Sequence, residues 1–152
     1  VNKKDAYVRE RAKALGIEQR YFTREDFYNS DKIVDLLTLR KTDLIVLAGF
    51  LWLVPQNLLA AFPNKIVNIH PALLPAYGGK GMYGHHVHQA VIAARESKSG
   101  ITIHYVNEQY DRGDIIFQAE CSLTDQDTVE TLEEKIHLLE KEHYPKVIDS
   151  IL

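Results

Sequence analysis

Two apolar runs of strand length limit the folds open to this chain, the first unbroken and the second interrupted only by Asn68. The first is Asp43-Leu-Ile-Val-Leu-Ala-Gly49, closed by a glycine, and the second is Lys65 to Ile69, stopped by His70-Pro71. A run without polar alternation suits a strand that is buried on both faces, as in a parallel sheet covered by helices. The runs therefore predict buried strands at the centre of an α/β fold.

Helix signals alternate with these strands. Asp5 suits an N-cap and Gly16 a helix end, Pro55 suits a first helical position, and Asp127 stands three residues before Glu130 in a capping-box-like start. The expected helices cover 5–15, a segment beginning at Ser30, 55–62, 87–94 and 127 to about 139 or beyond, with Pro145 expected to bend or interrupt the tail. Further expected strands cover 17–22, a half-exposed 101–106, and 115–123 as its antiparallel-looking neighbour. This order predicts an α/β class with a Rossmann-like, largely parallel sheet flanked by helices.

The start of the chain bears on its domain organisation. Residues Val1-Asn2-Lys3-Lys4 read as the tail of a strand running into a helix. We therefore expect residues 1–152 to form a single domain that lacks its N-terminal βα unit. In open sheets of this kind, ligands bind beyond the C-terminal ends of the strands.

Bulk properties argue against several classes of partner. The formal net charge is -3, whereas a general nucleic-acid binder is usually basic. No run approaches the roughly 20 apolar residues of a membrane helix. The single cysteine, Cys121, cannot form an internal disulfide, which suits a reducing cytosol. We expect a cytoplasmic protein without nucleic-acid or membrane partners, and a homodimer stays open.

Polar residues stand where the second apolar run ends. If Ile69 points into the core, alternation places Asn68 and His70 together on the opposite side of the strand. An amide and an imidazole side by side suit acyl transfer to an amine, because both can donate hydrogen bonds to a developing negative oxygen. Taken alone, the pair also fits a plain strand end.

A carboxylate further along the chain could complete this group. Asp111 lies in Tyr110-Asp-Arg-Gly-Asp114, which by itself reads as a turn. If this loop folds back over His70, the carboxylate favours the charged ring and raises the pKa of the histidine above its reference of about 6.5. It would also fix the ring and accept the proton lost by an attacking amine, directly or through water.

Three segments, in their order and spacing, resemble the phosphoribosylglycinamide formyltransferase family. They are Leu47-Ala-Gly-Phe50, Asn68-Ile-His-Pro-Ala-Leu-Leu-Pro75 and Asp111-Arg-Gly113, and the likeness extends over essentially the whole chain. The resemblance implies transfer of a formyl group from 10-formyltetrahydrofolate to the amine of glycinamide ribonucleotide. It also implies that Asn68, His70 and Asp111 form the catalytic set.

The resemblance further implies how the substrates are held. A flat pterin suits backbone groups beside an apolar wall. The expected folate contacts are Arg24, Leu51, Trp52, Leu53, Val54, Asn68, Asn107, Glu108, Gln109, Tyr110 and Asp111. The expected ribonucleotide contacts are His137, Leu138, Leu139 and Glu140. The glycine- and serine-rich phosphate loop of the family has no counterpart in this sequence.

Other functions share the same residues. A formyltetrahydrofolate hydrolase, a methionyl-tRNA formyltransferase and a sugar-amine formyltransferase would use the same Asn, His and Asp chemistry. The Pro71–Pro75 continuation and the end at Leu152 favour the ribonucleotide enzyme. A non-catalytic folate-binding protein is an alternative of a different class.

The cluster His85-His-Val-His88 could suggest a metal site, because imidazole rings can bind zinc. A strong zinc site requires further ligands at defined distances, so we expect no metal.

Overall fold

The protein is described from a computed structural model that covers residues 1–152. The chain forms two compact units, Val1–Thr42 and Asp43–Leu152. The expectation of one domain that lacks an N-terminal βα unit stays a prediction. None of the helices has the length and apolarity that crossing a membrane requires.

The first unit holds three short helices, α1 (Val8–Ala14), α2 (Arg24–Tyr28) and α3 (Lys32–Leu39). The helix expected before Gly16 is confirmed, and this glycine follows its end at a φ of 67°. The strand expected at 17–22 does not form, and no other strand lies in this unit to pair with it. The sequence reading missed α2, which begins at a capping box between Thr23 and Asp26.

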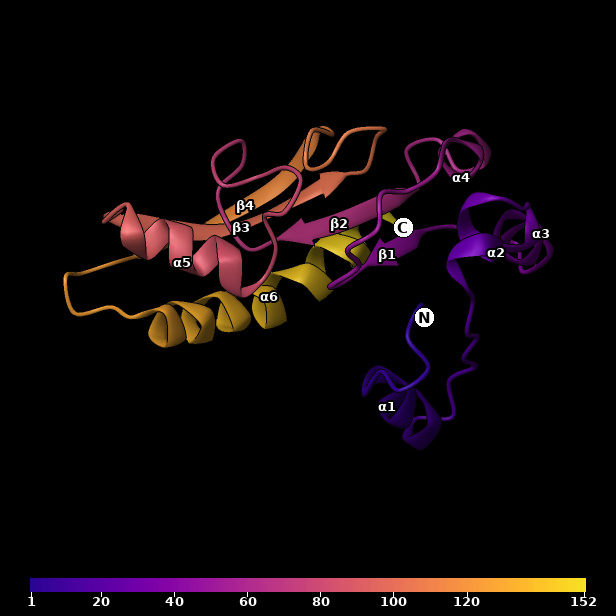
Figure 1. Cartoon of the computed structure of the whole chain (residues 1–152), viewed down its shortest axis with the longest axis horizontal. Coiled ribbons are helices and arrows are strands. Elements are labelled where there is room, and N and C mark those ends of the chain that lie inside the picture. Colours follow the sequence, from indigo (N-terminus) through magenta and orange to yellow (C-terminus); the bar gives the residue numbers. More distant parts are fainter. The chain divides into compact units, whose positions relative to one another are not determined.

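The second unit is built on a four-stranded sheet in the order β1-β2-β3-β4 (Figure 1). Its strands are β1 (Ile45–Leu47), β2 (Ile66–His70), β3 (Lys98–Tyr105) and β4 (Ile115–Ser122). β1 and β2 are parallel, whereas β2–β3 and β3–β4 are antiparallel. The α/β class and the predicted antiparallel pair near the C-terminus are confirmed, and the sheet is mixed.

The helices of this unit explain the mixed pairing. They are α4 (Gln56–Ala61), α5 (His85–Ala93) and α6 (Val129–Ile151). In Figure 1, α5 continues in the direction of β2 before the chain turns back into β3. In a βαβ unit the helix runs opposite to the first strand and returns the chain for a second, parallel strand. Because α5 does not return the chain in this way, β3 runs antiparallel to β2.

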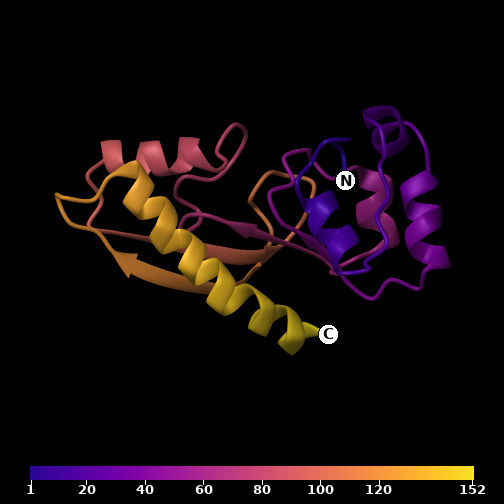
Figure 2. The same ribbon diagram turned by 90° about the horizontal axis from the view of Figure 1, so that it is seen from below.

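The core lies between the sheet and the helices α5 and α6, which pack beside each other with α6 across the sheet (Figure 2). Ile101 and Ile103 of β3 and Leu132 and Ile136 of α6 are fully buried. The prediction that β3 is half exposed is wrong. Thr102 is buried as well, because the loop after β2 covers it and bonds its hydroxyl group, which donates to the Ala72 carbonyl at 2.7 Å.

Helix α6 runs through Pro145 to Ile151, so the proline does not interrupt it. Proline inside a helix removes one backbone hydrogen bond and weakens it. Tertiary contacts on both sides of Pro145 compensate, since Tyr144 and Val147 are buried. The Tyr144 hydroxyl group also donates to the Leu47 carbonyl at 2.7 Å, which ties α6 to β1.

Candidate active site

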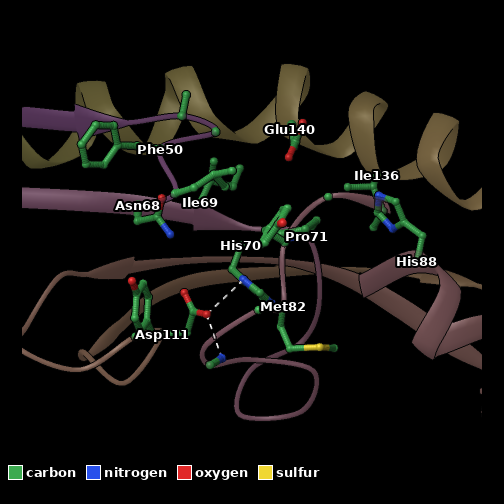
Figure 3. A pocket seen from close by; sticks show the side chains of 18 of the residues that line it. Phe50, Asn68, Ile69, His70, Pro71, Met82, His88, Asp111, Ile136 and Glu140 are labelled. Atoms are coloured by element: carbon green, nitrogen blue, oxygen red, sulfur yellow. Dashed lines mark hydrogen bonds and ion pairs between the residues drawn. The ribbon is translucent and has the colours of Figure 1, made fainter. Parts of the chain in front are cut away.

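The end of β2 and the loop between β3 and β4 bring an amide, an imidazole and a carboxylate together. Asn68 and His70 lie on β2, and Asp111 reaches the His70 ring from the loop (Figure 3). The His70 Nδ1 atom lies 3.5 Å from Asp111 Oδ2, and the two side chains are only 3% and 12% exposed. The three residues expected to form the catalytic set therefore share one site.

Local sequence makes the 106–114 loop fold back. A side chain at Gly113 would clash with the Tyr105 carbonyl, so only glycine allows this close approach of the two backbone segments. The Asn107 side chain accepts a hydrogen bond from the Gln109 N–H at 2.9 Å, a turn typical of asparagine. Asp111 itself has a φ of 54°, in the left-handed region that Asp tolerates better than most residues.

Asp111 is held as an ionised carboxylate. Its Oδ2 atom accepts a hydrogen bond from the Gly79 N–H at 2.9 Å, and its Oδ1 atom lies 3.7 Å from His104 Nε2. Burial raises the pKa of Asp111, but the interactions with His104, the Gly79 N–H and His70 together outweigh burial and leave this pKa below its ordinary value. The site therefore holds a fixed negative charge at neutral pH.

The protonation of His70 differs from the expectation. Its Nε2 atom lies 2.8 Å from the Tyr77 carbonyl oxygen, which can only accept, so Nε2 carries a proton. Burial lowers the pKa of His70 and outweighs the opposing effects of Asp111 and the Tyr77 carbonyl, while His104 lowers it further. The prediction of a raised pKa is wrong, because it considered the carboxylate and left out desolvation.

His104 links Asn68 to the same group. Its Nδ1 atom lies 2.8 Å from the Tyr105 carbonyl oxygen and therefore carries a proton. Its Nε2 atom lies 3.3 Å from the Asn68 side-chain nitrogen and 3.7 Å from Asp111 Oδ1, so the ring contacts both residues. His104 is 2% exposed and contacts Asn68 from β3, the strand beside β2.

A cavity of about 570 Å³ opens beside these side chains. The glycine-rich loop 79–84 and residues 48–51 border it, and α6 contributes His137 and Glu140. Figure 3 shows Glu140 on α6. Burial raises the pKa of Glu140, and His137 opposes this shift. Of the residues expected to contact the ribonucleotide, these two line the cavity. The structure does not bring Leu138 to it, since that side chain is 66% exposed, and Leu139 packs against the hydrophobic core.

A smaller cavity of about 50 Å³ adjoins the same side chains. It shares Phe50, Asn68, Tyr110 and Asp111 with the larger one. Among the expected folate contacts, it is lined by Trp52, Leu53, Val54, Asn68, Gln109, Tyr110 and Asp111, while Leu51 lines the larger cavity.

Three expected folate contacts lie elsewhere. Asn107 and Glu108 belong to the loop but line neither cavity. Arg24 lies on α2 of the first unit, with its guanidinium group 5.4 Å from the centre of the Tyr28 ring. Folate binding by these three residues stays a prediction.

His88 is a site residue that sequence reasoning considered only as a metal ligand. It lines the larger cavity from α5, is 2% exposed, and its Nδ1 atom has no hydrogen-bond partner. Burial lowers its pKa, an effect that Glu133 opposes and the nearby His137, His85 and His70 rings reinforce. No group of three or more His, Cys, Asp or Glu side chains is placed to hold a metal ion. His88 lies on the inner face of α5 with Val87 and Val91, which are in the core. Its spacing from these valines in the sequence could have indicated that His88 is buried.

Comparison with known proteins assigns the chain to a family. The model of the family described as formyl transferase matches residues 1–148. The chain belongs to this family. A curated relative, the chloroplastic phosphoribosylglycinamide formyltransferase of Arabidopsis thaliana, is 42% identical over 99% of this chain and 53% of its own length. The phosphoribosylglycinamide formyltransferase of Bacillus subtilis (strain 168) is 40% identical over 99% of this chain and 77% of its own length.

Solved structures of the family share the fold. The crystal structure of phosphoribosylglycinamide formyltransferase from Streptococcus pneumoniae TIGR4 matches with a TM-score of 0.87 and 35% identity, over 99% of this chain and 83% of that chain. The structure of glycinamide ribonucleotide transformylase 1 from Geobacillus kaustophilus matches with a TM-score of 0.88 and 37% identity, over 99% of this chain and 80% of that chain. The chain thus spans about half the length of its Arabidopsis relative and more of the bacterial ones.

Proposed function

We propose that the protein transfers a formyl group from 10-formyltetrahydrofolate to the amine of glycinamide ribonucleotide, a step of purine biosynthesis. Membership of the formyl transferase family and the names of the relatives support this. The observation that carries the proposal is that Asn68 and Asp111 line both cavities, with His70 beside Asp111 in the larger one. A transfer enzyme needs residues at such a shared border, because its two substrates must meet at one carbon atom.

The smaller cavity suits the pterin end of the folate. Trp52, Leu53 and Val54 supply its apolar wall, and Asp111 and Asn68 supply the polar groups that a flat heterocycle needs to be oriented. The folate supplies the formyl group.

The larger cavity suits the amine substrate. Glu140 faces it from α6, with His137 one helical turn earlier, and these groups can bind hydroxyl groups of a ribose. Lys80 on the glycine-rich loop borders the same cavity and adds a positive charge that suits an anionic substrate.

The side chains at the border can carry out the transfer. The Asn68 amide donates a hydrogen bond to the formyl oxygen, which becomes negative as the amine nitrogen bonds to the formyl carbon. His70 is neutral at rest, because burial lowers its pKa, and its Nδ1 atom takes up a proton from solvent before it donates to the same oxygen. Asp111 accepts the proton lost by the amine, directly or through water, and stabilises the charged ring of His70. When the bond between the formyl carbon and the folate nitrogen breaks, the proton held by Asp111 passes to that nitrogen, directly or through water, and His70 returns its proton to solvent, so the site regains its starting charge.

The test of this proposal is release of tetrahydrofolate from 10-formyltetrahydrofolate, measured with and without glycinamide ribonucleotide. Transfer predicts release only when the ribonucleotide is present, with formation of the formylated amine. Release without the ribonucleotide would show a hydrolase instead. Binding of the folate without any turnover would leave a folate-binding protein.

Location and assembly belong to the same proposal. We propose that the protein is cytoplasmic, in keeping with its single cysteine, Cys121. The names of two plant relatives include the word chloroplastic, so imaging of a fluorescent fusion in the source cells is the direct test. A homodimer and the absence of a bound metal stay predictions, and light scattering and metal analysis of the purified protein test them.

A further inference from the structure

Two residues of one short segment hold both ionisable groups of the candidate active site. The Tyr77 carbonyl accepts the hydrogen bond of His70 Nε2 at 2.8 Å. Two positions later, the Gly79 N–H donates to Asp111 Oδ2 at 2.9 Å. The segment 77–79 therefore contacts the imidazole and the carboxylate from one side and sets how they face each other.

The backbone of this segment is fixed by its own packing. Tyr77 has a φ of 55°, which is uncommon for a residue other than glycine and has to be held by its surroundings. Gly78 lies against Asp111, since a Cβ atom placed on it would be 3.2 Å from Asp111 Cβ. Small displacements of the segment would therefore move the carboxylate.

One side-chain hydrogen bond anchors the segment to the rest of the unit. The Tyr77 hydroxyl group donates to Glu96 Oε1 at 2.6 Å. Glu96 stands in the turn between α5 and β3, where its N–H bonds the Val91 carbonyl. The hydrogen bond with Glu96, and then burial, raise the pKa of Tyr77 to about 12, so the hydroxyl group remains a donor at every pH at which the protein would work.

This arrangement determines the proton positions on His70. The Tyr77 carbonyl can only accept, and so can the ionised carboxylate of Asp111 near Nδ1. Only Nε2 is at hydrogen-bond distance from its acceptor, at 2.8 Å against 3.5 Å for Nδ1, so in the neutral ring the proton is on Nε2, and Nδ1 takes up a proton when the ring becomes charged. The other titratable groups that face His70 are His104 and His88, and neither contacts Nε2.

We propose that Tyr77 is a positioning residue, whose carbonyl group fixes His70 with a proton on Nε2 and whose hydrogen bond to Glu96 keeps that carbonyl in place. The expected effect on turnover rests on the proposed function, whereas the effect on the ring of His70 does not. The role differs from that of the catalytic set, because Tyr77 and Glu96 would act only through His70.

Nuclear magnetic resonance of the histidine rings tests the proposal without any substrate. The ring ¹⁵N shifts of His70, assigned by their loss in His70→Asn, report which nitrogen carries the proton and where the ring titrates. We would compare the wild type with Tyr77→Phe, Glu96→Ala and Glu96→Gln. Glu120→Ala is the matched control, because Glu120 on β4 is also an exposed carboxylate and is bonded to Lys98 at 2.8 Å.

The wild type, Glu96→Gln and Glu120→Ala should keep the proton on Nε2, since glutamine still accepts the hydrogen bond of Tyr77. Tyr77→Phe and Glu96→Ala should show a mixture of the two ring forms and a lower titration midpoint, because the carbonyl contact favours the charged ring. Their kcat for formyl transfer should fall about three- to tenfold, the effect of losing one hydrogen bond, with little change in KM.

A wild-type ring form and midpoint in both Tyr77→Phe and Glu96→Ala would overturn the proposal. If Tyr77→Phe does not fold, Glu96→Ala decides alone, since it leaves the tyrosine in the loop. If the two variants change the ring signals but the wild type does not transfer formyl groups, the role of Tyr77 is supported and the proposed function is contradicted. If the two variants keep the wild-type ring signals and the wild type does transfer formyl groups, the role of Tyr77 is contradicted and the proposed function is supported.

Discussion

The Nδ1 atom of His70 lies 3.5 Å from the Oδ2 atom of Asp111, although one residue ends a central strand and the other lies in a loop between two different strands. Burial lowers the pKa of His70, and the interactions of Asp111 lower the pKa of the carboxyl group below its ordinary value. At neutral pH an ionised carboxylate therefore lies beside a neutral ring, and the carboxylate stabilises the charged form of this ring.

Asp111→Asn tests whether the carboxylate stabilises the charged ring of His70. The amide keeps the size of the side chain and an oxygen that can accept from the Gly79 N–H, but it removes the negative charge beside His70. We expect the pKa of His70 to fall further and kcat to drop about a hundredfold or more, the scale of losing an acid–base group. Steady-state kinetics and a histidine titration of the same variant measure both effects. A normal kcat in a folded Asp111→Asn protein would refute the role of the carboxylate.

Gly113→Ala tests the fold of the loop that carries Asp111. The added methyl group would clash with the Tyr105 carbonyl, so the loop has to move. We expect a loss of stability of about 1–3 kcal/mol and a loss of activity larger than that of any surface variant. Gly81→Ala is the comparison variant, because it adds backbone strain without a clash: Gly81 has a φ of 88°, and no atom lies within 4 Å of an added Cβ. Urea unfolding should show the larger loss for Gly113→Ala, and equal losses would contradict the clash.

Two buried histidines should make the protein less stable in mild acid. Burial lowers the pKa of His70 and of His88 in the folded state, whereas the unfolded chain titrates at about 6.5. The unfolded state therefore binds more protons as the pH falls below about 6.5, and the free energy of unfolding decreases from there down to the folded-state pKa values.

His88→Gln separates the contribution of His88. Glutamine does not titrate, so urea unfolding of this variant between pH 7.5 and 5.5 should show a smaller decrease in the free energy of unfolding than the wild type. His86→Gln is a matched control from the same helix, since His86 is exposed. An equal pH dependence in the wild type and His88→Gln would contradict the assignment.

Tyr144→Phe tests the tie between α6 and β1. The variant removes the hydroxyl group that donates to the Leu47 carbonyl and leaves that carbonyl without this partner. We expect a loss of about 1–2 kcal/mol in the free energy of unfolding. Tyr7→Phe should change it little, because Tyr7 is 72% exposed. Similar unfolding midpoints for both variants would show that the hydrogen bond does not stabilise the fold.

Local pattern predicted the parts of the fold and the site that depend on neighbours in sequence. The apolar runs identified β1 and β2, and the order of Asn68, Ile69 and His70 placed the amide and the imidazole at one strand end. The resemblance to the family then connected Asp111 with them. The strands and the segments that contain the three site residues can each be recognised from a short stretch of sequence.

Features that depend on tertiary contacts could not be read in the same way. The burial of Thr102 and His104 on β3 arises from loops that cover the strand, so alternation wrongly predicted a half-exposed strand. Desolvation of His70 depends on everything packed around it, and this reversed the predicted pKa shift. Tyr77 and Gly79 contact the site through backbone atoms. Because every residue has a backbone carbonyl group and nearly every residue has a backbone N–H, the residue types do not indicate these contacts.

The central claim is that the ring of His70 acts at the carbon atom that is transferred. The most direct measurement is the rate of formyl transfer to glycinamide ribonucleotide by the wild type and by His70→Asn, with circular dichroism to show that the variant is folded. We predict a fall of about a hundredfold or more, since the variant loses a charged donor to the formyl oxygen. A folded His70→Asn protein that transfers formyl at the wild-type rate would contradict the account.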